Sequence, residues 1–184
     1  MKEQNLTRIS KFLSLILRHS PQTVGIQIDY QGGWTDVETL IQKVNQNGKY
    51  HITMQLLEEI VRTDEKQRYC FNPDKTKIRA NQGHSIPVDL GLNEQTPPEI
   101  LYHGTAERFL QSIAEKGLLP MSRNHVHLSK DEETALKVGK RHGKPYILKI
   151  KSGEMHRKGI KFYLSENGVW LTEYVSPEYL IWEK

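Results

Sequence analysis

The chain has 184 residues, enough for one domain of ordinary size or for two small ones. Hydrophobic residues make up 36% and charged residues 26%, a balance typical of a soluble globular protein with a modest core. The net charge of +4 favours polyanionic partners without requiring them. A single cysteine, Cys70, excludes an internal disulfide and a thiolate zinc cluster, so we expect a reducing, cytoplasmic compartment. The apolar run at residues 12–17 is far too short to span a bilayer, so no membrane partner is expected.

The first predicted element is an amphipathic helix over residues 6–17, where apolar side chains recur at helical spacing. Arg18 and His19 follow at its end, just before Ser20-Pro21 would stop a helix. Cations in a last helical turn face the negative end of the helix dipole. By itself, therefore, each of the two has a sufficient structural explanation.

Two more helices and a hairpin are expected before residue 81. Thr35 and Glu38 have capping-box spacing, which predicts the start of a second helix that ends at Gly48. Thr53 is placed to cap a third helix. The stretches "KQRYCF" and "KIRA", joined by the turn "NPDKT", then predict two paired strands, with Arg68 as an ordinary exposed strand residue. Three helices followed by a hairpin is the order of a winged-helix module.

A change of composition separates two lobes. Gly, Pro, Gln and Asn are frequent from residue 81 to residue 98, and few apolar residues cluster there. Such a composition is typical of a linker. We therefore expect a first lobe over residues 1–82, a linker over 83–98 and a second lobe over 99–184.

The second lobe is predicted to be mostly antiparallel β-structure with two helices near its beginning. "EILYHGT" indicates a strand that runs into a glycine turn, and residues 106–116 a helix with Phe109 facing inward. "HVHLS" indicates a short strand, and Ser129 and Glu132 after it have capping-box spacing. Further strands are expected at "YILKI", "IKFYLS", "VWLTEYV" and "YLIWE". The fold class is therefore α+β.

Two short motifs carry groups suited to chemistry. His103, Gly104 and Thr105 stand at an expected strand end, where glycine lets a backbone approach a ligand, although a simple turn explains them equally well. The stretch "MSRNHVHLS" places two imidazoles on one strand face, after Arg123 and before Ser129. Because no Asp, Glu or Cys lies nearby at ligand spacing, no metal site is predicted.

Positive charge is concentrated in residues 137–161, which carry nine Lys or Arg against one acid, Glu154. A solvated basic face and a contact with phosphate explain this run equally well. Phosphate or pyrophosphate contacts of this kind would carry no information about base sequence.

The motifs together closely resemble those of the KptA-type RNA 2′-phosphotransferases, the family that includes the tRNA-splicing 2′-phosphotransferase of eukaryotes. The matching stretches occur in one order over most of the chain: "LSLILRHSP", "EKQRYCF", "ANQGHSIPVDL", "LYHGT" and "MSRNHVHLS". The resemblance implies a winged-helix RNA lobe joined to an NAD-binding lobe with an ADP-ribosyltransferase-like fold. It also implies a monomer that acts on RNA carrying an internal 2′-phosphate.

The resemblance further implies a two-step reaction that consumes NAD. The RNA 2′-phosphate displaces nicotinamide to give RNA-2′-phospho-ADP-ribose, and the 2″-hydroxyl then attacks phosphorus. The products are 2′-OH RNA and ADP-ribose 1″,2″-cyclic phosphate. The family's catalytic set falls on four positions that are intact here: Arg18, His19, Arg68 and Arg123.

Cofactor contacts are implied in the second lobe. The resemblance assigns them to His103, Gly104, Thr105, His127 and Ser129, with the two histidines near the nicotinamide-ribose half. Glu173, on a late strand, could activate a weak nucleophile in a related enzyme. A phosphate nucleophile needs no such help, so we expect Glu173 not to be required.

Two other functions are compatible with parts of this pattern. A related enzyme could use the same sites to ADP-ribosylate terminal phosphates on nucleic acid, and the intact Arg-His-Arg-Arg set does not separate the two. A non-catalytic winged-helix binding protein with a decayed second lobe is the other alternative. It would have lost Arg68, Arg123 or the second-lobe motifs, and all of these are present.

Overall fold

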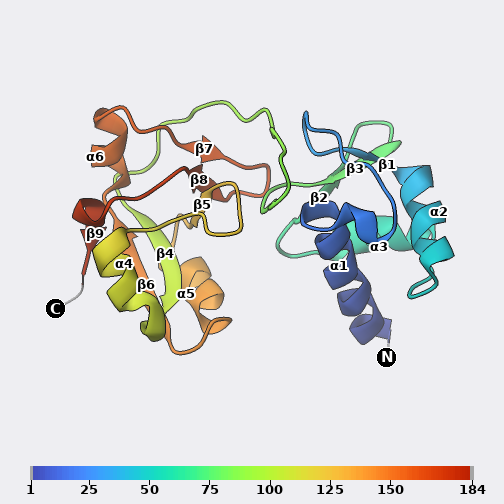
Figure 1. Cartoon of the computed structure of the whole chain (residues 1–184), viewed down its shortest axis with the longest axis horizontal. Helices are drawn as coiled ribbons and strands as arrows, with labels where there is room; N and C mark the ends of the chain where they lie inside the picture. Colours follow the sequence, from blue (N-terminus) through green and yellow to red (C-terminus); the bar gives the residue numbers. More distant parts are fainter. Residues whose placement is uncertain (1, 183–184) are drawn as a thin grey trace. The chain divides into compact units, whose positions relative to one another are not determined.

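The structure is a computed structural model that describes residues 2–182. The chain divides between Gly91 and Leu92 into two compact units, each with its own hydrophobic core. Helices occur beside small antiparallel sheets in both units (Figure 1), which confirms the α+β class. Residues 1, 183 and 184, at the outer ends of the two expected lobes, lie outside the described residues.

In its described residues, 2–91, the first unit contains three α-helices, one 3₁₀ helix and one three-stranded sheet. Its elements are α1 (Lys2–Arg18), η1 (Pro21–Thr23), β1 (Thr35–Asp36), α2 (Val37–Asn47), α3 (Met54–Thr63), β2 (Tyr69–Phe71) and β3 (Lys77–Ala80). The strand order is β1-β3-β2, and both pairs are antiparallel. The hairpin expected from "KQRYCF" and "KIRA" is confirmed by the pairing of β2 with β3.

The apolar face of α1 lies at the centre of the first core. Ile9, Leu13 and Ile16 are at most 2% exposed, and they recur at the expected helical spacing. Burying a side chain of this size contributes roughly 1.5–3 kcal/mol each. The predicted amphipathic helix is therefore confirmed, and it extends beyond the predicted range to Lys2–Arg18.

The ends of α2 and α3 follow the expected signals in two of three cases. Thr53 caps α3 by accepting a hydrogen bond from the Leu56 N–H at 3.2 Å. Gly48 ends α2 with a left-handed backbone, φ 82°, which glycine adopts without a steric penalty. Both of these predictions are confirmed.

The capping box predicted at Thr35 is wrong. Asp36 caps α2 instead, and its carboxylate accepts from the N–H and the hydroxyl of Thr39 at 2.9 and 2.8 Å. Those two hydrogen bonds hold the pKa of the Asp36 carboxyl below its usual value. Thr35 is paired with Ile78 in the sheet, so β1 runs directly into the helix and shifts the cap by one residue.

The chain that follows β3 packs back onto the first unit. The Asn81 N–H donates to the Arg68 carbonyl at 2.8 Å, and the Asp89 N–H donates to the Tyr30 carbonyl at 2.7 Å. His84 is 2% exposed. The first part of the segment that composition marks as a linker is therefore bonded to the first unit.

Over residues 92–182, the part of the second unit that the structure describes, there are two three-stranded antiparallel sheets and three α-helices. Its elements are β4 (Leu101–Ala106), η2 (Glu107–Phe109), α4 (Leu110–Lys116), β5 (Val126–Leu128), α5 (Glu132–Lys140), β6 (Pro145–Ile150), α6 (Ser152–Arg157), β7 (Tyr163–Leu164), β8 (Trp170–Thr172), η3 (Pro177–Tyr179) and β9 (Leu180–Ile181). The strand orders are β4-β6-β9 and β5-β8-β7. Two helices were expected, and the short helix α6 was missed.

Close packing of β4 against α5 explains two glycines of this unit, Gly104 and Gly139. A Cβ on Gly104 would lie 1.7 Å from the Ala135 carbonyl oxygen, and one on Gly139 would lie 2.7 Å from that of Thr105. β4 continues through Gly104 to Ala106, so the expected glycine turn is wrong. Gly104 is required by the neighbouring helix rather than by a bend in the chain.

Three smaller expectations in the second unit have different outcomes. The alternation of "HVHLS" is confirmed, because Val126 and Leu128 are buried. The inward position of Phe109 is wrong, since 40% of it is exposed. The capping box at Ser129 is also wrong, because Asp131 caps α5 by accepting from the Thr134 N–H at 2.7 Å.

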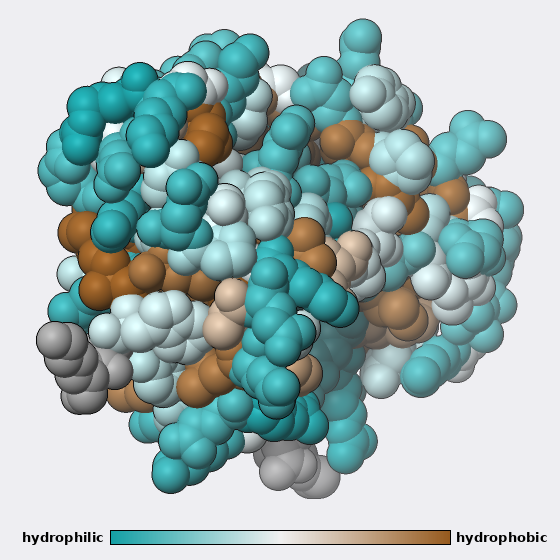
Figure 2. Space-filling view, turned by 60° about the vertical axis from the view of Figure 1, so that its left-hand side comes forward, coloured by the Kyte–Doolittle hydropathy of each residue, from teal (hydrophilic) through white to brown (hydrophobic). Residues whose placement is uncertain are grey.

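Hydrophilic residues predominate on the face shown in Figure 2, and hydrophobic residues show between them. Within residues 2–182, no helix combines the length and the apolar character that crossing a membrane requires.

Candidate active site

The end of α1 fixes the backbone of Arg18. The Arg18 carbonyl accepts hydrogen bonds from the N–H groups of Ser85 and Ile86 at 3.0 and 3.4 Å. The guanidinium donates from Nη1 to the Ser14 hydroxyl at 3.1 Å, and the whole residue is only 7% exposed. A helix end normally leaves such carbonyls to water. Here the segment that follows β3 satisfies the carbonyl and holds the arginine in place.

The imidazole of His19 is positioned by the same segment. Its Nδ1 lies 2.8 Å from the Ser85 hydroxyl, and its backbone N–H donates to the Leu15 carbonyl at 3.0 Å. Ser85 therefore contacts both predicted catalytic residues at the end of α1: Arg18 through its backbone and His19 through its side chain. Sequence reasoning did not single it out, although it lies within the quoted stretch "ANQGHSIPVDL".

His84 lies beneath these cations as a neutral side chain. Burial, together with the smaller effects of the nearby Arg18, His19 and Arg79 side chains, lowers its pKa to about 4. A Cβ on Gly33 would lie 3.1 Å from its Nε2, which shows how closely the surrounding loop packs on the ring. An uncharged ring at this place adds no repulsion to the three cations around it.

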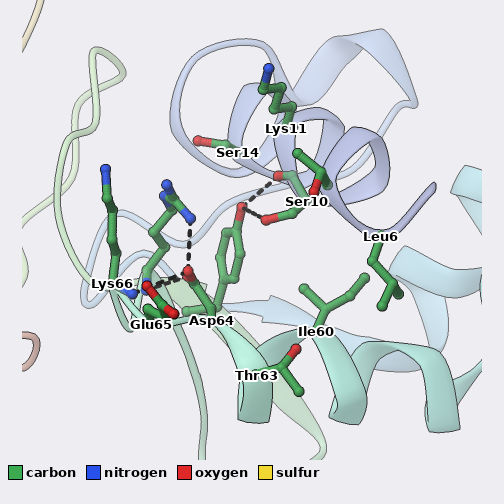
Figure 3. Close-up of a pocket in the computed structure, with 12 residues that line it drawn as sticks. Leu6, Ser10, Lys11, Ser14, Ile60, Thr63, Asp64, Glu65 and Lys66 are labelled. Carbon is green, nitrogen blue, oxygen red and sulfur yellow. Dashed lines mark hydrogen bonds and ion pairs between the residues drawn. The ribbon is translucent and has the colours of Figure 1, made fainter. Parts of the chain in front are cut away.

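Arg68 is held by Asp64, the residue that ends α3. Asp64 Oδ1 accepts from the Arg68 guanidinium at 2.7 Å, and Oδ2 accepts from the Arg68 N–H at 2.8 Å. The two side chains are 8% and 31% exposed, so the ion pair is partly shielded from water. Asp64 thus positions Arg68 in the wall of a pocket beside α1 (Figure 3). The four-residue spacing of an acid and an arginine is the signal that could have identified this pair.

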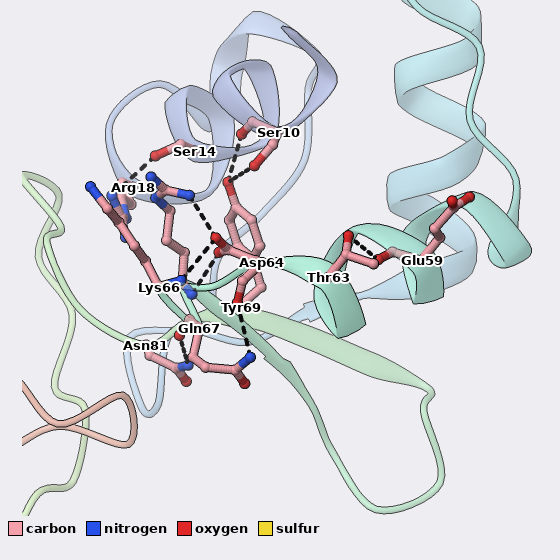
Figure 4. Close-up of polar contacts among 11 residues, drawn as sticks. Ser10, Ser14, Arg18, Glu59, Thr63, Asp64, Lys66, Gln67, Tyr69 and Asn81 are labelled. Carbon is pink, nitrogen blue, oxygen red and sulfur yellow. Dashed lines mark hydrogen bonds and ion pairs between the residues drawn. The ribbon is translucent and has the colours of Figure 1, made fainter. Parts of the chain in front are cut away.

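Tyr69 lies close to both guanidinium groups. Its hydroxyl donates to the Ser10 carbonyl at 2.6 Å (Figure 4), and burial raises the pKa of the phenol. The hydrogen bond with Ser10 and the charges of Arg18 and Arg68 act in the opposite direction. Because the charges of both guanidinium groups influence one ring, the structure brings Arg18 and Arg68, two of the three predicted site residues of the first unit, close together.

In the second unit His103 is held in one tautomer. Its Nδ1 lies 2.9 Å from the His127 carbonyl oxygen, so Nδ1 carries the proton and Nε2 is left as an acceptor. Burial is the main reason that its pKa lies below the usual value, and the charge of His142 lowers it further. His103 therefore presents a neutral imidazole at neutral pH.

His127 is held in the opposite tautomer by Arg123. The Arg123 Nη1 lies 2.9 Å from His127 Nδ1, and a guanidinium can only donate, so Nδ1 accepts and Nε2 carries the proton. Burial lowers the pKa of Arg123, which stays far above neutrality. The pair presents one fixed cation and one neutral imidazole.

The remaining candidate cofactor residues are placed by β4 and the chain after β5. Gly104 and Thr105 are buried within β4, and Ser129 exchanges two backbone hydrogen bonds with Tyr102 at 2.7 and 2.9 Å. His103, His127 and Ser129 therefore lie on neighbouring segments of one unit. The smallness of Gly104 is explained by α5, as described above.

The four catalytic candidates belong to different units. Arg123 lies in the second unit and the other three candidates lie in the first, so their convergence on one phosphate stays a prediction. In residues 2–182 no group of three or more His, Cys, Asp or Glu is arranged to hold a metal ion.

The basic run at 137–161 is largely engaged in ion pairs. The pairs are Lys137 with Glu133, Lys144 with Glu107, Lys149 with Glu132, Arg157 with Glu99 and Lys158 with Glu154, at 2.7 to 3.9 Å. Exposed pairs of this kind typically contribute only about 0–1 kcal/mol each. They nevertheless favour the interpretation of this run as a solvated face.

The amino-acid sequence of this chain is similar to those of known proteins. The family model described as "RNA 2'-phosphotransferase, Tpt1 / KptA family" matches residues 4–174. A protein of Flavobacterium johnsoniae is 54% identical over 98% of each chain, and one of Nostoc punctiforme is 52% identical over the same shares. A protein of Escherichia coli O6:K15:H31 is 49% identical over 98% of this chain and 97% of its own. Each of the three is named "Probable RNA 2'-phosphotransferase".

Proposed function

Because this chain belongs to the Tpt1/KptA family of RNA 2′-phosphotransferases, we propose that it removes an internal RNA 2′-phosphate by transferring it to NAD. Transfer of the 2′-phosphate from RNA is the activity that the family description names. The use of NAD as acceptor is our more specific proposal. The observation that carries it is the match over residues 4–174 together with four intact candidate residues: Arg18, His19, Arg68 and Arg123.

We assign RNA to the first unit and NAD to the second. A winged-helix assignment for the first unit is supported by its order of three helices and a hairpin, with β1 added to the sheet. An ADP-ribosyltransferase-like assignment for the second is supported by its two small antiparallel sheets, which carry His103 and His127 on β4 and β5.

The arginines suit a phosphate that acts as the nucleophile. A phosphate dianion needs positioning more than it needs a strong base. Guanidinium groups bind phosphate oxygens in a planar fork and stay charged at neutral pH. Arg18 and Arg68 are held by Ser14 and Asp64, so they would meet the phosphate with little loss of side-chain entropy. In the second step the same charges would stabilise negative charge that builds up at phosphorus.

His19 is the proposed proton carrier. The second step requires a proton for the departing RNA 2′-oxygen and removes one from the attacking hydroxyl. Imidazole ordinarily titrates near neutrality and can serve in both transfers. The Ser85 hydroxyl, which lies 2.8 Å from Nδ1, orients the imidazole for these transfers.

The residues of the second unit fit a positively charged nicotinamide ring. Neutral His103 and His127 add no repulsion there. NAD would supply the ADP-ribosyl group that accepts the phosphate and yields ADP-ribose 1″,2″-cyclic phosphate. Arg123, fixed on His127, would bind a phosphate oxygen from this side.

The test is to incubate the protein with a 2′-phosphorylated oligonucleotide, with and without NAD, and to follow both RNA and nucleotide products. We expect 2′-OH RNA, nicotinamide and the cyclic phosphate only when NAD is present. Turnover without NAD, or no turnover with it, would overturn the proposal. The matched 5′- and 3′-phosphorylated oligonucleotides test the alternative, which predicts ADP-ribosylated RNA ends.

The role of His19 has its own test. His19→Ala should let the RNA-2′-phospho-ADP-ribose species accumulate, because only the second step moves protons. Equal slowing of both steps would contradict a proton-carrying role. Arg68→Ala serves as the comparison, because its loss should slow the first step as well.

A further inference from the structure

A pocket of about 320 Å³ lies beside α1 (Figure 3), and Arg68 of the candidate catalytic set is part of its lining. Its floor is apolar and tightly packed, since Ile60 and Tyr69 are 3% and 1% exposed. Its rim is polar and comes from α1 and from the turn that follows α3. The lining residues are Leu6, Thr7, Ser10, Lys11, Ser14, Ile60, Thr63, Asp64, Glu65, Lys66, Arg68 and Tyr69.

The charge at this rim is positive. The carboxylate of Asp64 is engaged by the Arg68 guanidinium and by the N–H groups of Lys66 and Arg68. Lys11 extends from α1 and Lys66 from the turn, and both residues are exposed (Figure 3). With Arg68 they provide three cations against two acids, Asp64 and the exposed Glu65. The surplus charge favours an anionic ligand.

One hydroxyl group of the rim, that of Ser14, can donate to a ligand that accepts hydrogen bonds. The phenol of Tyr69 gives its proton to the Ser10 carbonyl, so the Ser10 hydroxyl, 3.2 Å away, donates to the phenol oxygen. The Ser14 oxygen instead accepts from Arg18 at 3.1 Å, which leaves its own proton to donate. A phosphodiester oxygen accepts from both ammonium groups and hydroxyls, and it fits this set of donors.

The pocket is continuous with the proposed reaction site on one face of α1. Lys11, Ser14 and Arg18 are three and four residues apart, so they line up along the helix. At a rise of 1.5 Å per residue, Lys11 lies about 10 Å along the axis from Arg18. Arg68 belongs both to the pocket and to the candidate catalytic set. Since RNA carries a phosphate at every nucleotide, a strand held at Arg18 and Arg68 places its next phosphates near this pocket.

We propose that this pocket binds the phosphodiester backbone of the RNA strand beside the 2′-phosphorylated nucleotide. Lys11 and Lys66 neutralise backbone phosphates, and the Ser14 hydroxyl donates to one of their oxygens. Because the aromatic ring of Tyr69 is buried, bases do not stack here, and the contact carries no base preference. This inference rests on the proposed function, which places the 2′-phosphate at Arg18 and Arg68.

The salt dependence of RNA binding tests the pocket directly. Affinity for a 2′-phosphorylated oligonucleotide of about ten nucleotides is measured without NAD, from about 50 to 200 mM salt, for wild type, Lys11→Ala, Lys66→Ala and the double variant. Each lost phosphate contact should reduce the slope of log K against log salt by about 0.7, and the double variant by about 1.4. Over that range one contact corresponds to about 2.6-fold in affinity.

Lys77→Ala is the matched control. It removes one exposed positive charge from β3 of the same unit, outside the pocket, where Lys77 lies 3.7 Å from Asp29. Its slope should stay at the wild-type value. If Lys11→Ala and Lys66→Ala change the slope no more than Lys77→Ala does, the pocket is not the backbone site.

A turnover assay with the wild-type protein distinguishes failure of this inference from failure of the proposed function on which it rests. If wild type with NAD leaves the 2′-phosphate on the RNA, the proposed function fails whatever the slopes are. If wild type removes the phosphate and the slopes of the pocket variants are unchanged, only the pocket assignment fails. Unmodified RNA of the same length should show the same slope change in the pocket variants, since the backbone phosphates are the ligand.

Discussion

Replacing Ser85 by alanine tests whether the segment after β3 positions the imidazole of His19, the proposed proton carrier. The variant removes the 2.8 Å contact between the Ser85 hydroxyl and His19 Nδ1. It keeps the backbone hydrogen bonds from Ser85 and Ile86 to the Arg18 carbonyl, because alanine has the same N–H. Ser85 is exposed, so the fold should be little affected.

The expected size of the effect follows from that one hydrogen bond. A net contribution of about 0.5–1.5 kcal/mol corresponds to a rate loss of about 2- to 13-fold if all of it acts on the positioning of His19. The loss should fall on the second step, in which His19 is proposed to move protons. Ser85→Thr retains the hydroxyl and should recover most of the rate.

Single-turnover kinetics with a 2′-phosphorylated oligonucleotide and NAD measure the two steps separately. Ser20→Ala is the control, since the side chain of Ser20, next to His19, makes no capping hydrogen bond to η1. A change below about 1.5-fold in the second step, or an equal change in both steps, would refute the reasoning. A shifted pH–rate profile in Ser85→Ala would distinguish positioning of His19 from a general loss of stability.

Three further predictions concern His84, Gly104 and Glu173. His84 has a folded pKa of about 4 and an ordinary value of 6.5, so the unfolded chain binds the extra proton first and stability falls as the pH drops below 6.5. Urea unfolding should show that the free energy of unfolding falls by about 2–3 kcal/mol between about pH 7.5 and 4.5. His84→Gln should largely abolish this fall. An equal fall in that variant would contradict the assignment of the pH dependence to His84. Gly104→Ala should destabilise the second unit by at least about 1–3 kcal/mol, because the new Cβ would lie 1.7 Å from the Ala135 carbonyl oxygen. If urea unfolding shows unchanged stability in this variant, the packing argument is wrong. Glu173→Gln should keep kcat within about tenfold of wild type, and a loss of about 100-fold in a folded variant would show that Glu173 is a required acid or base.

Local signals were sufficient where one physical requirement acted alone. The apolar period predicted α1 because burial of one helix face outweighs other preferences over so many residues. Thr53 and Gly48 predicted helix ends because each satisfies a local backbone requirement. The pairing of "KQRYCF" with "KIRA" followed from a change of period and a turn between them.

The errors occurred where a distant segment competed with a local signal. Thr35 and Ser129 both have capping-box spacing, yet each is drawn into backbone pairing with another strand, and an aspartate nearer the helix caps it. Gly104 looked like a turn residue because a sequence does not reveal that α5 packs against β4. The six residues of α6 are too few for a helical period to be recognised.

For the candidate site, the sequence by itself determined which residue types are present and in what order, and these identify the family and its chemistry. It could not determine how those residues are held. Only the tertiary structure brings Ser85 to His19, sets the opposite tautomers of His103 and His127, and gathers Lys11 and Lys66 beside Arg68. The physical reason is that hydrogen bonds and charges act over a few ångströms in space, whereas the residues they join lie up to 66 positions apart in the chain.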